Sequence, residues 1–365
     1  MMKHSRSRFF IFLIGAYVSL HPTVSDAQEA FYKGKRLTML INFAAGGGVD
    51  IEGRLFARHL SKHIAGQPTI IVQNMPGGAG LNAVNYLGEV APKDGTVFGY
   101  LAGVPWQFAT EPEKFRLDLR SYQFVAYEAN ATVFYARADI PPGIKKPADI
   151  ARASGIVSGG LGASHPRDLG IRLTLDMLGM PYRHVSGYQS TQTARLAFQR
   201  NEINFFGETT ASYRTTVQSL IDSGQAVPIY FSPSWNGETL GVPNQLAGLP
   251  ILPFQEVYQQ VKGTMPSGQL WDVYLAAVGL TSTMARLDVL PPGAPQAATA
   301  SLRRAVQQLR HDKDFAEEAI RSIGYVPEYE AGPEIDRQAR STLTVHPDIK
   351  TFVAGYIKRG GSGAR

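Results

Sequence analysis

The hydrophobic pattern near the start of the chain predicts a buried strand, a glycine turn and an amphipathic helix. Residues 37–43 are mostly apolar, which is typical of a strand buried on both faces of a parallel sheet. Residues 46–48 are all glycine, and glycine lets the backbone turn sharply and approach another group closely. Apolar residues then recur at helical spacing over 51–64. Because the first N–H groups of a helix lack partners within it, this turn predicts an anion site.

The same order of strand, glycine turn and helix occurs twice more. Strand 69–73 leads into the second turn, residues 74–80, and strand 96–101 then completes a β-α-β-α-β unit. Further along, a short strand is followed by the third turn, residues 158–165. A helix begins there at Pro166, a residue suited to the first helical turn. The repeated pattern predicts an α/β protein.

Two segments suggest that the chain passes between two lobes. The long apolar stretch 122–137 is broken at residues 128–130, as expected for a hinge, and strand 226–231 is positioned to return to the first lobe. Residues 236–270 give no clear assignment, and 271–280 predict a strand or a short buried segment. The expected division is a signal peptide at 1–27, lobe I at 28–131 and 234–357, lobe II at 132–233, and a disordered tail at 358–365.

Composition narrows the setting in which the protein works. Lys3, Arg6 and Arg8 precede an apolar run over 9–20, and small residues surround a cleavage site after about Ala27. The run is too short for a membrane anchor, which needs about 20 residues, so we expect a soluble, exported protein in the periplasm. The absence of cysteine excludes disulfides, thiolate metal sites and a lipidated N-terminal cysteine.

The charge is mildly basic. The formal net charge of +6 falls to +4 when the leader, which carries a net +2, is removed. No dense basic stripe with interleaved aromatic residues is present, so nucleic acid is not expected as a partner.

With these turns in order, the chain resembles the periplasmic solute receptors of the tripartite tricarboxylate transporters, the Bug/TctC family. Each matching segment is weak alone, but the ordered set is specific and covers most of the mature sequence. The segments are 43–50 with Arg54-Leu55, 74–80, 91–96, 290–295, and Asp314-Phe315 followed by 324–327.

The resemblance implies a fold, a ligand and partners. The fold would be the two-lobed periplasmic binding protein fold (type II, Venus flytrap), each lobe a mixed, mostly parallel sheet flanked by helices. A monomer would bind a small carboxylate in the cleft, without a cofactor or metal, and deliver it to the membrane permease subunits of a tripartite transporter. In this family, backbone N–H groups of the first two turns hold one carboxylate through bridging waters, and the glycine turn of the other lobe closes on the far end.

Residues of the turns and their surroundings are the expected ligand-binding set. Asp50 would orient water or ligand, or cap its own helix, while Phe43 and Trp106 would line the cleft or pack in the core. The set is Phe43, Ala45, Gly46, Gly47, Gly48, Asp50, Asn74, Gly77, Gly78, Ala79, Gly80, Trp106, Ser158, Gly160, Gly162, Ala163, Ser164, His165, Tyr188 and Glu208.

Departures from the family pattern bear on the ligand. The second turn has the order Gly-Gly-Ala-Gly where the family more often has Gly-Ala-Gly-Gly, and the segment at 185–190 lacks a lysine that could face the ligand. A carboxylate from Glu208 in the cleft would repel a dianion. A monocarboxylate, or a ligand with an amino or amide group, is therefore an alternative to a di- or tricarboxylate.

The same residues also suggest other functions. Gly162 to Pro166 imitates a nucleophile elbow, so an exported serine hydrolase using Ser164 is one alternative, although proline replaces the second glycine. An orphan receptor with a sensory role is another. Residues 48–55 lack the lysine and hydroxyl of a phosphate-binding loop, and Ile51 replaces a dinucleotide-binding glycine. His59 and His63 share a helix, but no third metal ligand is evident. We therefore expect no enzyme activity.

Overall fold

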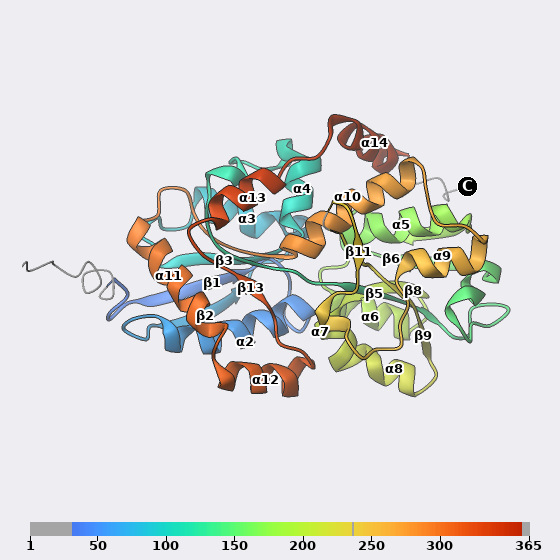
Figure 1. Cartoon of the computed structure of the whole chain (residues 1–365), viewed down its shortest axis with the longest axis horizontal. Coiled ribbons are helices and arrows are strands. Elements are labelled where there is room, and N and C mark those ends of the chain that lie inside the picture. Colours follow the sequence, from blue (N-terminus) through green and yellow to red (C-terminus); the bar gives the residue numbers. More distant parts are fainter. Residues whose placement is uncertain (1–30, 236, 360–365) are drawn as a thin grey trace, which may run out of the picture.

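Two mixed β-sheets lie along the long axis of the molecule and organise it into two parts (Figure 1). The computed structural model describes residues 31–235 and 237–359, so the predicted leader and residues 360–365 of the predicted tail lie outside it. We call the part built on the six-stranded sheet lobe I and the part built on the five-stranded sheet lobe II. The predicted mixed α/β fold is confirmed.

The six-stranded sheet of lobe I has the order β13-β4-β12-β3-β1-β2. Strand β1 pairs in parallel with β2 and β3, as the glycine-turn pattern predicted, while β12 and β13 pair antiparallel with their neighbours. The strands are β1 (Arg36–Ile41), β2 (Thr69–Asn74), β3 (Val97–Ala102), β4 (Gln123–Glu128), β12 (Arg286–Leu290) and β13 (Tyr329–Glu330).

The five-stranded sheet of lobe II has the order β7-β6-β8-β5-β9. Strand β6 pairs in parallel with β7 and β8, while β5 pairs antiparallel with β8 and β9. Because antiparallel pairs are at least as frequent as parallel ones, the sheets are mixed rather than mostly parallel. The strands are β5 (Thr132–Arg137), β6 (Ile156–Gly159), β7 (Tyr182–Val185), β8 (Phe205–Thr209) and β9 (Ala226–Phe231).

Helices flank both sheets (Figure 1). Those in lobe I are α2 (Gly48–His63), α3 (Leu81–Glu89), α4 (Val104–Thr110), α11 (Gln296–Leu309), α12 (Lys313–Ile323) and α13 (Ile335–Thr342). Those in lobe II are α5 (Pro166–Leu178), α6 (Thr191–Gln199), α7 (Thr210–Ser212) and α8 (Gln218–Asp222). After β9 the chain forms a small hairpin of β10 (Ser234–Trp235) and β11 (Leu240–Gly241), and then α9 (Phe254–Lys262). The last helix is α14 (Pro347–Lys358), which contacts α4 and α10.

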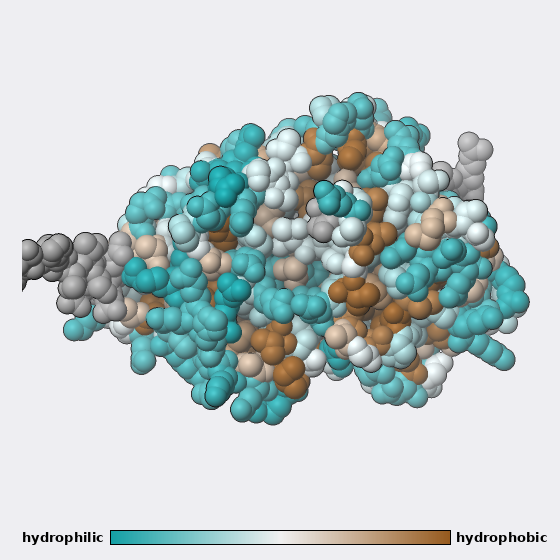
Figure 2. All heavy atoms as spheres, viewed as in Figure 1, coloured by the Kyte–Doolittle hydropathy of each residue, from teal (hydrophilic) through white to brown (hydrophobic). Residues whose placement is uncertain are grey.

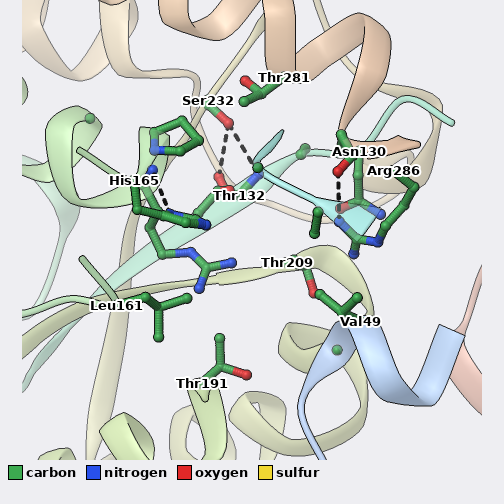
Figure 3. Close-up of a pocket in the computed structure, with 18 of the residues that line it drawn as sticks. Val49, Asn130, Thr132, Leu161, His165, Thr191, Thr209, Ser232, Thr281 and Arg286 are labelled. Atoms are coloured by element: carbon green, nitrogen blue, oxygen red, sulfur yellow. Dashed lines mark hydrogen bonds between the residues drawn. The ribbon is translucent and has the colours of Figure 1, made fainter. Parts of the chain in front are cut away.

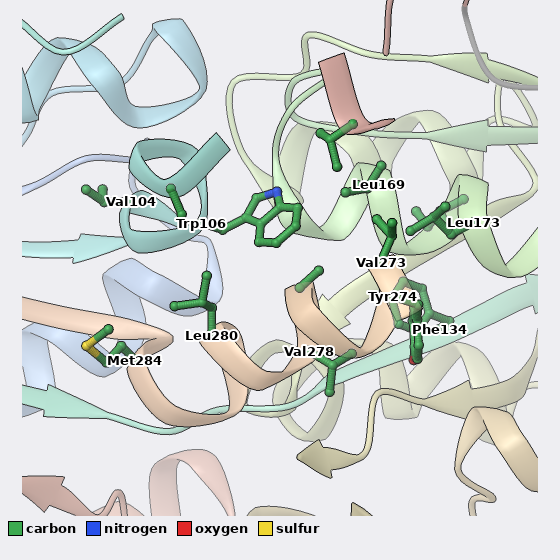
Figure 4. Packing of buried hydrophobic residues seen from close by; sticks show 14 of the residues in the cluster. Val104, Trp106, Phe134, Leu169, Leu173, Val273, Tyr274, Val278, Leu280 and Met284 are labelled. Atoms are coloured by element: carbon green, nitrogen blue, oxygen red, sulfur yellow. The ribbon is translucent and has the colours of Figure 1, made fainter. Parts of the chain in front are cut away.

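Residues 271–280 were predicted to form a strand or a short buried segment; the strand is wrong, because the segment belongs to the largely buried helix α10 (Gln269–Met284). This helix packs against α5 of lobe II and α4 of lobe I. Figure 4 shows its residues Val273 and Val278 among the buried side chains between these elements. A helix enclosed by two lobes is apolar on most sides, and this hides the 3.6-residue period that would identify it.

The surface is mainly polar on the face shown in Figure 2, where hydrophobic residues appear as small separate groups. Among the helices that the structure describes, none has both the length and the apolar character needed to cross a bilayer. The large apolar side chains are instead collected in the cores of the two lobes and in the core between them.

Candidate functional site

A cavity of about 70 Å³ lies where lobe I, lobe II and α10 meet, and we call it the first cavity. Figure 3 shows side chains from both lobes converging on it, including Val49 from lobe I and Thr191 and Thr209 from lobe II. A buried water needs roughly 10–15 Å³, so the first cavity has room for several waters or a small organic molecule.

The N-terminus of α2 forms one wall of this cavity, as the sequence predicted for the first glycine turn. Gly47 is the N-cap of α2 and Gly48 its first residue, and both line the cavity. A Cβ atom added to Gly48 would lie 2.1 Å from the Thr209 hydroxyl oxygen, and one added to Gly47 would lie 3.0 Å from that of Thr191. Only glycine therefore allows lobe II to approach the helix end this closely.

Three hydroxyl groups of lobe II meet this helix end. The side-chain oxygens of Thr191, Thr209 and Ser212 are buried and have no hydrogen-bond partner among the described residues. A buried hydroxyl without a partner is unfavourable by about 1–3 kcal/mol. The cluster of such groups beside free helix N–H donors is therefore an arrangement that a ligand would complete.

Arg167 contributes a positive charge to the first cavity, and sequence reasoning missed it. It lines the cavity from the first turn of α5, is only 7% exposed, and its Nε and Nη1 atoms have no partner among the described residues. Burial is the main reason that its pKa falls to about 10, which still leaves it charged at neutral pH. A cation in the first turn of a helix is disfavoured by the helix dipole, and this was the signal that could have revealed it.

His165 fixes the start of α5 beside Arg167. Its Nδ1 accepts a hydrogen bond from the Arg167 backbone N–H at 3.2 Å. Its ring packs edge to face against that of Phe43 of lobe I, with the ring centroids 5.7 Å apart. Burial, with the charge of Arg167, lowers the pKa of His165 to about 3. The ring is therefore neutral at physiological pH and carries its proton on Nε2, because Nδ1 is an acceptor.

Asp50 and Asn74 brace the first turn from behind instead of lining the cavity. The Asp50 carboxylate accepts hydrogen bonds from the Gly46 N–H at 3.0 Å and from Arg54 and Asn74. Although burial opposes ionisation, these bonds hold the pKa of Asp50 below its usual range. Asn74 also donates to the Phe43 carbonyl at 2.8 Å. The two side chains thus hold the turn in the shape that presents Gly47 and Gly48.

The third glycine turn uses its N–H donors internally. Leu161 and Gly162 donate from the backbone to the Asp168 carboxylate at 2.8 and 3.0 Å, and Gly160 donates to the Val185 carbonyl at 2.8 Å. Asp168 is fully buried and also contacts His184 at 3.1 Å. An internal carboxylate therefore takes the place that an anionic ligand was expected to occupy at this turn.

The second turn faces a second cavity rather than the first. This second cavity is separated from the first by Phe43 and Leu161, which line both. The first and second turns therefore do not meet at one point in this arrangement. The predicted residues that line the second cavity are Phe43, Gly77, Gly78, Ala79, Gly80, Gly162, Ala163, Ser164 and Tyr188.

Several predicted residues line neither cavity. Trp106 is fully buried and packs with Leu169 and Val273 (Figure 4). Ser158 contacts His184 at 2.8 Å. Ala45 and Gly46 also lie outside both cavities.

Glu208 lines neither cavity, whereas the sequence suggested that it could point into the cleft. Its carboxylate is fully buried, 2.6 Å from the Arg195 guanidinium and 2.8 Å from the Tyr135 hydroxyl. Its charge is therefore balanced within lobe II, and it gives no reason to expect repulsion of a dianion.

The histidine pair on α2 is also paired with acidic side chains. His59 Nε2 lies 2.6 Å from Glu318 Oε2, and His63 Nε2 lies 2.8 Å from Asp312 Oδ2. These two contacts join α2 to α12. Across the described ranges, no group of three or more metal-ligating side chains is arranged to hold an ion. Ser164 has no hydrogen bond to a histidine within the part of the chain that the structure describes.

Comparison with known proteins gives one curated relative. No family model matches the chain. The UPF0065 protein in the TAR-I ttuE-ttuC' intergenic region of Agrobacterium vitis is 29% identical over 189 residues, 48% of this chain and 52% of that protein. The chain thus spans about half the length of the curated relative that it matches.

Solved structures match over nearly the whole chain. The periplasmic binding protein BugD has 18% identity and a TM-score of 0.66, covering 89% of this chain and 98% of BugD. MatC from Rhodopseudomonas palustris with bound malate has 17% identity and a TM-score of 0.61, covering 90% of this chain and 99% of MatC. R. palustris Rpa4515 with adipate has 16% identity and a TM-score of 0.66, covering 88% of this chain and 97% of Rpa4515. The chain has the fold of these proteins, and the resemblance predicted from its motifs is confirmed at that level.

Proposed function

We propose that this chain is a non-catalytic solute receptor of the Bug/TctC type, exported to the periplasm, which binds a small organic carboxylate between its lobes and offers it to a membrane permease. The fold shared with BugD supports the receptor class. The bound malate and adipate in two structures of the same fold support a carboxylate as the ligand.

One observation carries the proposal: Arg167 is buried in the first cavity with two N–H groups unpaired. A buried guanidinium whose donors are unpaired is unfavourable, and its fork geometry matches a carboxylate. The hydroxyls of Thr191 and Thr209 and the free N–H groups at the α2 N-terminus complete the set of donors.

Closure of the lobes follows from where these donors lie. Arg167 belongs to lobe II and the α2 N-terminus to lobe I, so one anion can contact both only when the lobes are together. We propose hinges at residues 129–131, between β4 and β5, and at the return after β9. A ligand that contacts both lobes favours the closed form over the open one.

Calorimetry with ligand-stripped protein against mono-, di- and tricarboxylates tests this function. We expect at least one to bind and Arg167→Gln to weaken it by about 10- to 150-fold, the value of a lost charged hydrogen bond of 1.5–3 kcal/mol. The matched control is Arg183→Gln on β7, which changes an exposed arginine of the same lobe and leaves affinity unchanged. If no carboxylate of the panel binds, or if the Arg167 variant keeps full affinity, the proposal is contradicted.

A further inference from the structure

We propose that the first cavity selects monocarboxylates with a short apolar body and discriminates against dicarboxylates. This inference rests on the proposed function, since it names the class of carboxylate that the same site takes. It follows from the uneven distribution of unpartnered groups, charge and space around the cavity.

Three residues of lobe II line the cavity with unpartnered donors. Arg167 contributes two buried guanidinium nitrogens, and Thr191 and Thr209 contribute hydroxyls, that have no partner among the described residues. Figure 3 shows Thr191 and Thr209 on the same side of the cavity. One carboxylate accepts several hydrogen bonds through its two oxygens, so one carboxylate suffices to satisfy this group of donors.

Ser232 and Thr281 on the opposite side already have hydrogen-bond partners, whereas the hydroxyl of Tyr274 on α10, which also lines the cavity, has none among the described residues and is an uncharged donor. Figure 3 shows Ser232 and Thr281 on that side, across the cavity from Thr191. Ser232 accepts a hydrogen bond from the Thr132 N–H at 3.0 Å, and Thr281 donates to the Ala277 carbonyl at 2.9 Å. A second carboxylate at this end would have to compete with these bonds.

Charge is uneven in the same way. Arg286 also lines the cavity, but its guanidinium donates to the buried carboxylate of Glu52, with Nε–Oε2 at 2.7 Å. Asn130 lines the same region with an amide oxygen that has no partner among the described residues, and such an acceptor repels an anion. Arg167 is therefore the one cation of the cavity, among the described residues, without a carboxylate partner.

The remaining wall and the volume suit a small apolar body. Phe134, Ala277 and Val278 line the cavity and belong to the hydrophobic core between the lobes (Figure 4). The cavity volume of about 70 Å³ admits only a small molecule. A second carboxylate against these side chains would be buried without a counter-charge, which is unfavourable by several kcal/mol.

Two isosteric ligand pairs test charge separately from shape. Replacing one carboxylate of malonate by an isopropyl group gives 3-methylbutanoate, and the same change in succinate gives 4-methylpentanoate. With wild-type protein near neutral pH, calorimetry is expected to give at least about 100-fold tighter binding for the better branched monocarboxylate than for its dicarboxylate partner. Equal or tighter binding of the dicarboxylate in both pairs overturns the inference.

A change at the far end supplies a second, independent measurement. Thr281→Lys would place a cation across the cavity from Thr191 and is expected to shift the preference toward succinate by at least about tenfold. Thr283→Lys, on the same helix but not lining the cavity, is the matched control and keeps the wild-type preference. If thermal melting shows that the Thr281 variant is unfolded, the isosteric pairs with the wild-type protein decide alone.

The two proposals fail in distinguishable ways. If a dicarboxylate binds as tightly as its isostere and Arg167→Gln weakens that binding, the carboxylate receptor stands and the monocarboxylate inference is overturned. If no carboxylate of any charge binds, both are overturned.

Discussion

Replacing Gly48 by alanine is expected to hold the lobes apart without damaging either one. Gly48 is the first residue of α2 and has no positive φ, so alanine fits its backbone without strain. Within lobe I the change is favourable by up to about 1 kcal/mol, because alanine is the better helix former. The added methyl group projects toward lobe II, where it meets Thr209 and Ser212.

The distances set the size of the effect. The added Cβ would lie 2.1 Å from the Thr209 hydroxyl oxygen and 2.8 Å from that of Ser212, whereas ordinary contact begins at 3.4 Å. The lobes would therefore have to separate by about 1 Å at this point, which stretches a hydrogen bond across the cleft beyond its useful range. Loss of two or three such bonds, each about 1 kcal/mol, weakens ligand binding by about 30- to 150-fold.

Calorimetry measures the affinity, and small-angle X-ray scattering with ligand measures whether the lobes close. Gly48→Ala should lose affinity and fail to compact, while its melting temperature without ligand stays at or above the wild-type value. Thr209→Ala alone loses at most about tenfold, and combined with Gly48→Ala it removes the main clash and restores closure. Wild-type affinity in Gly48→Ala, or no rescue by the second change, would refute the proposed contact between the lobes.

Three further predictions follow from the same geometry. The pKa of His165, lowered to about 3, lies below its value in the unfolded state, so the protein loses stability as the pH falls from about 6.5 toward 3. In urea unfolding, His165→Gln should reduce the dependence of the unfolding free energy on pH by up to about 1.4 kcal/mol per pH unit. Equal pH dependence in the variant and the wild type would contradict this prediction. Arg195→Gln leaves the buried carboxylate of Glu208 without its arginine partner, with only the Tyr135 hydrogen bond, and should destabilise the fold by about 3 kcal/mol in the same assay. The ligand affinity of the Arg195→Gln variant should stay within about twofold of the wild-type value. A large loss of affinity without loss of stability would indicate that Glu208 belongs to the binding site. Gly47→Val meets the Thr191 hydroxyl and should abolish binding with an unchanged melting temperature, whereas normal affinity would mean that the anion binds elsewhere.

The first glycine turn could be predicted from sequence because its signals are local. An apolar strand, three glycines and an amphipathic helix identify a strand end and a helix N-terminus, and parallel pairing places that end at the edge of the sheet. The same reasoning predicted β1, β2, β3 and β9 closely. It failed at α10, where burial on most sides removes the amphipathic pattern.

The third glycine turn could not be interpreted from sequence because its partner was misjudged. Asp168 lies in the first turn of α5, where a carboxylate suits the positive end of the helix, yet it folds back to bind the turn's own N–H groups. An aspartate a few residues into a helix has the same sequence signature in either role. Arg167 was missed for a related reason. In the sequence, a single arginine next to an aspartate resembles an ordinary exposed pair, and only the structure shows that Arg167 is buried.

In the proposed receptor, the position of Arg167 would link ligand capture to closure, which backbone donors alone would not do. In an open form its guanidinium would face water, where an ion pair with a carboxylate is worth only about 0–1 kcal/mol. When the lobes meet, the same pair lies in the buried first cavity, beside Thr191, Thr209 and the α2 N-terminus. The lower effective dielectric there strengthens the attraction several-fold. Closure without an anion would instead bury an unpaired cation, which is unfavourable. In the proposed receptor, the anion would therefore supply free energy that favours closure, and opening would weaken the ion pair and allow release.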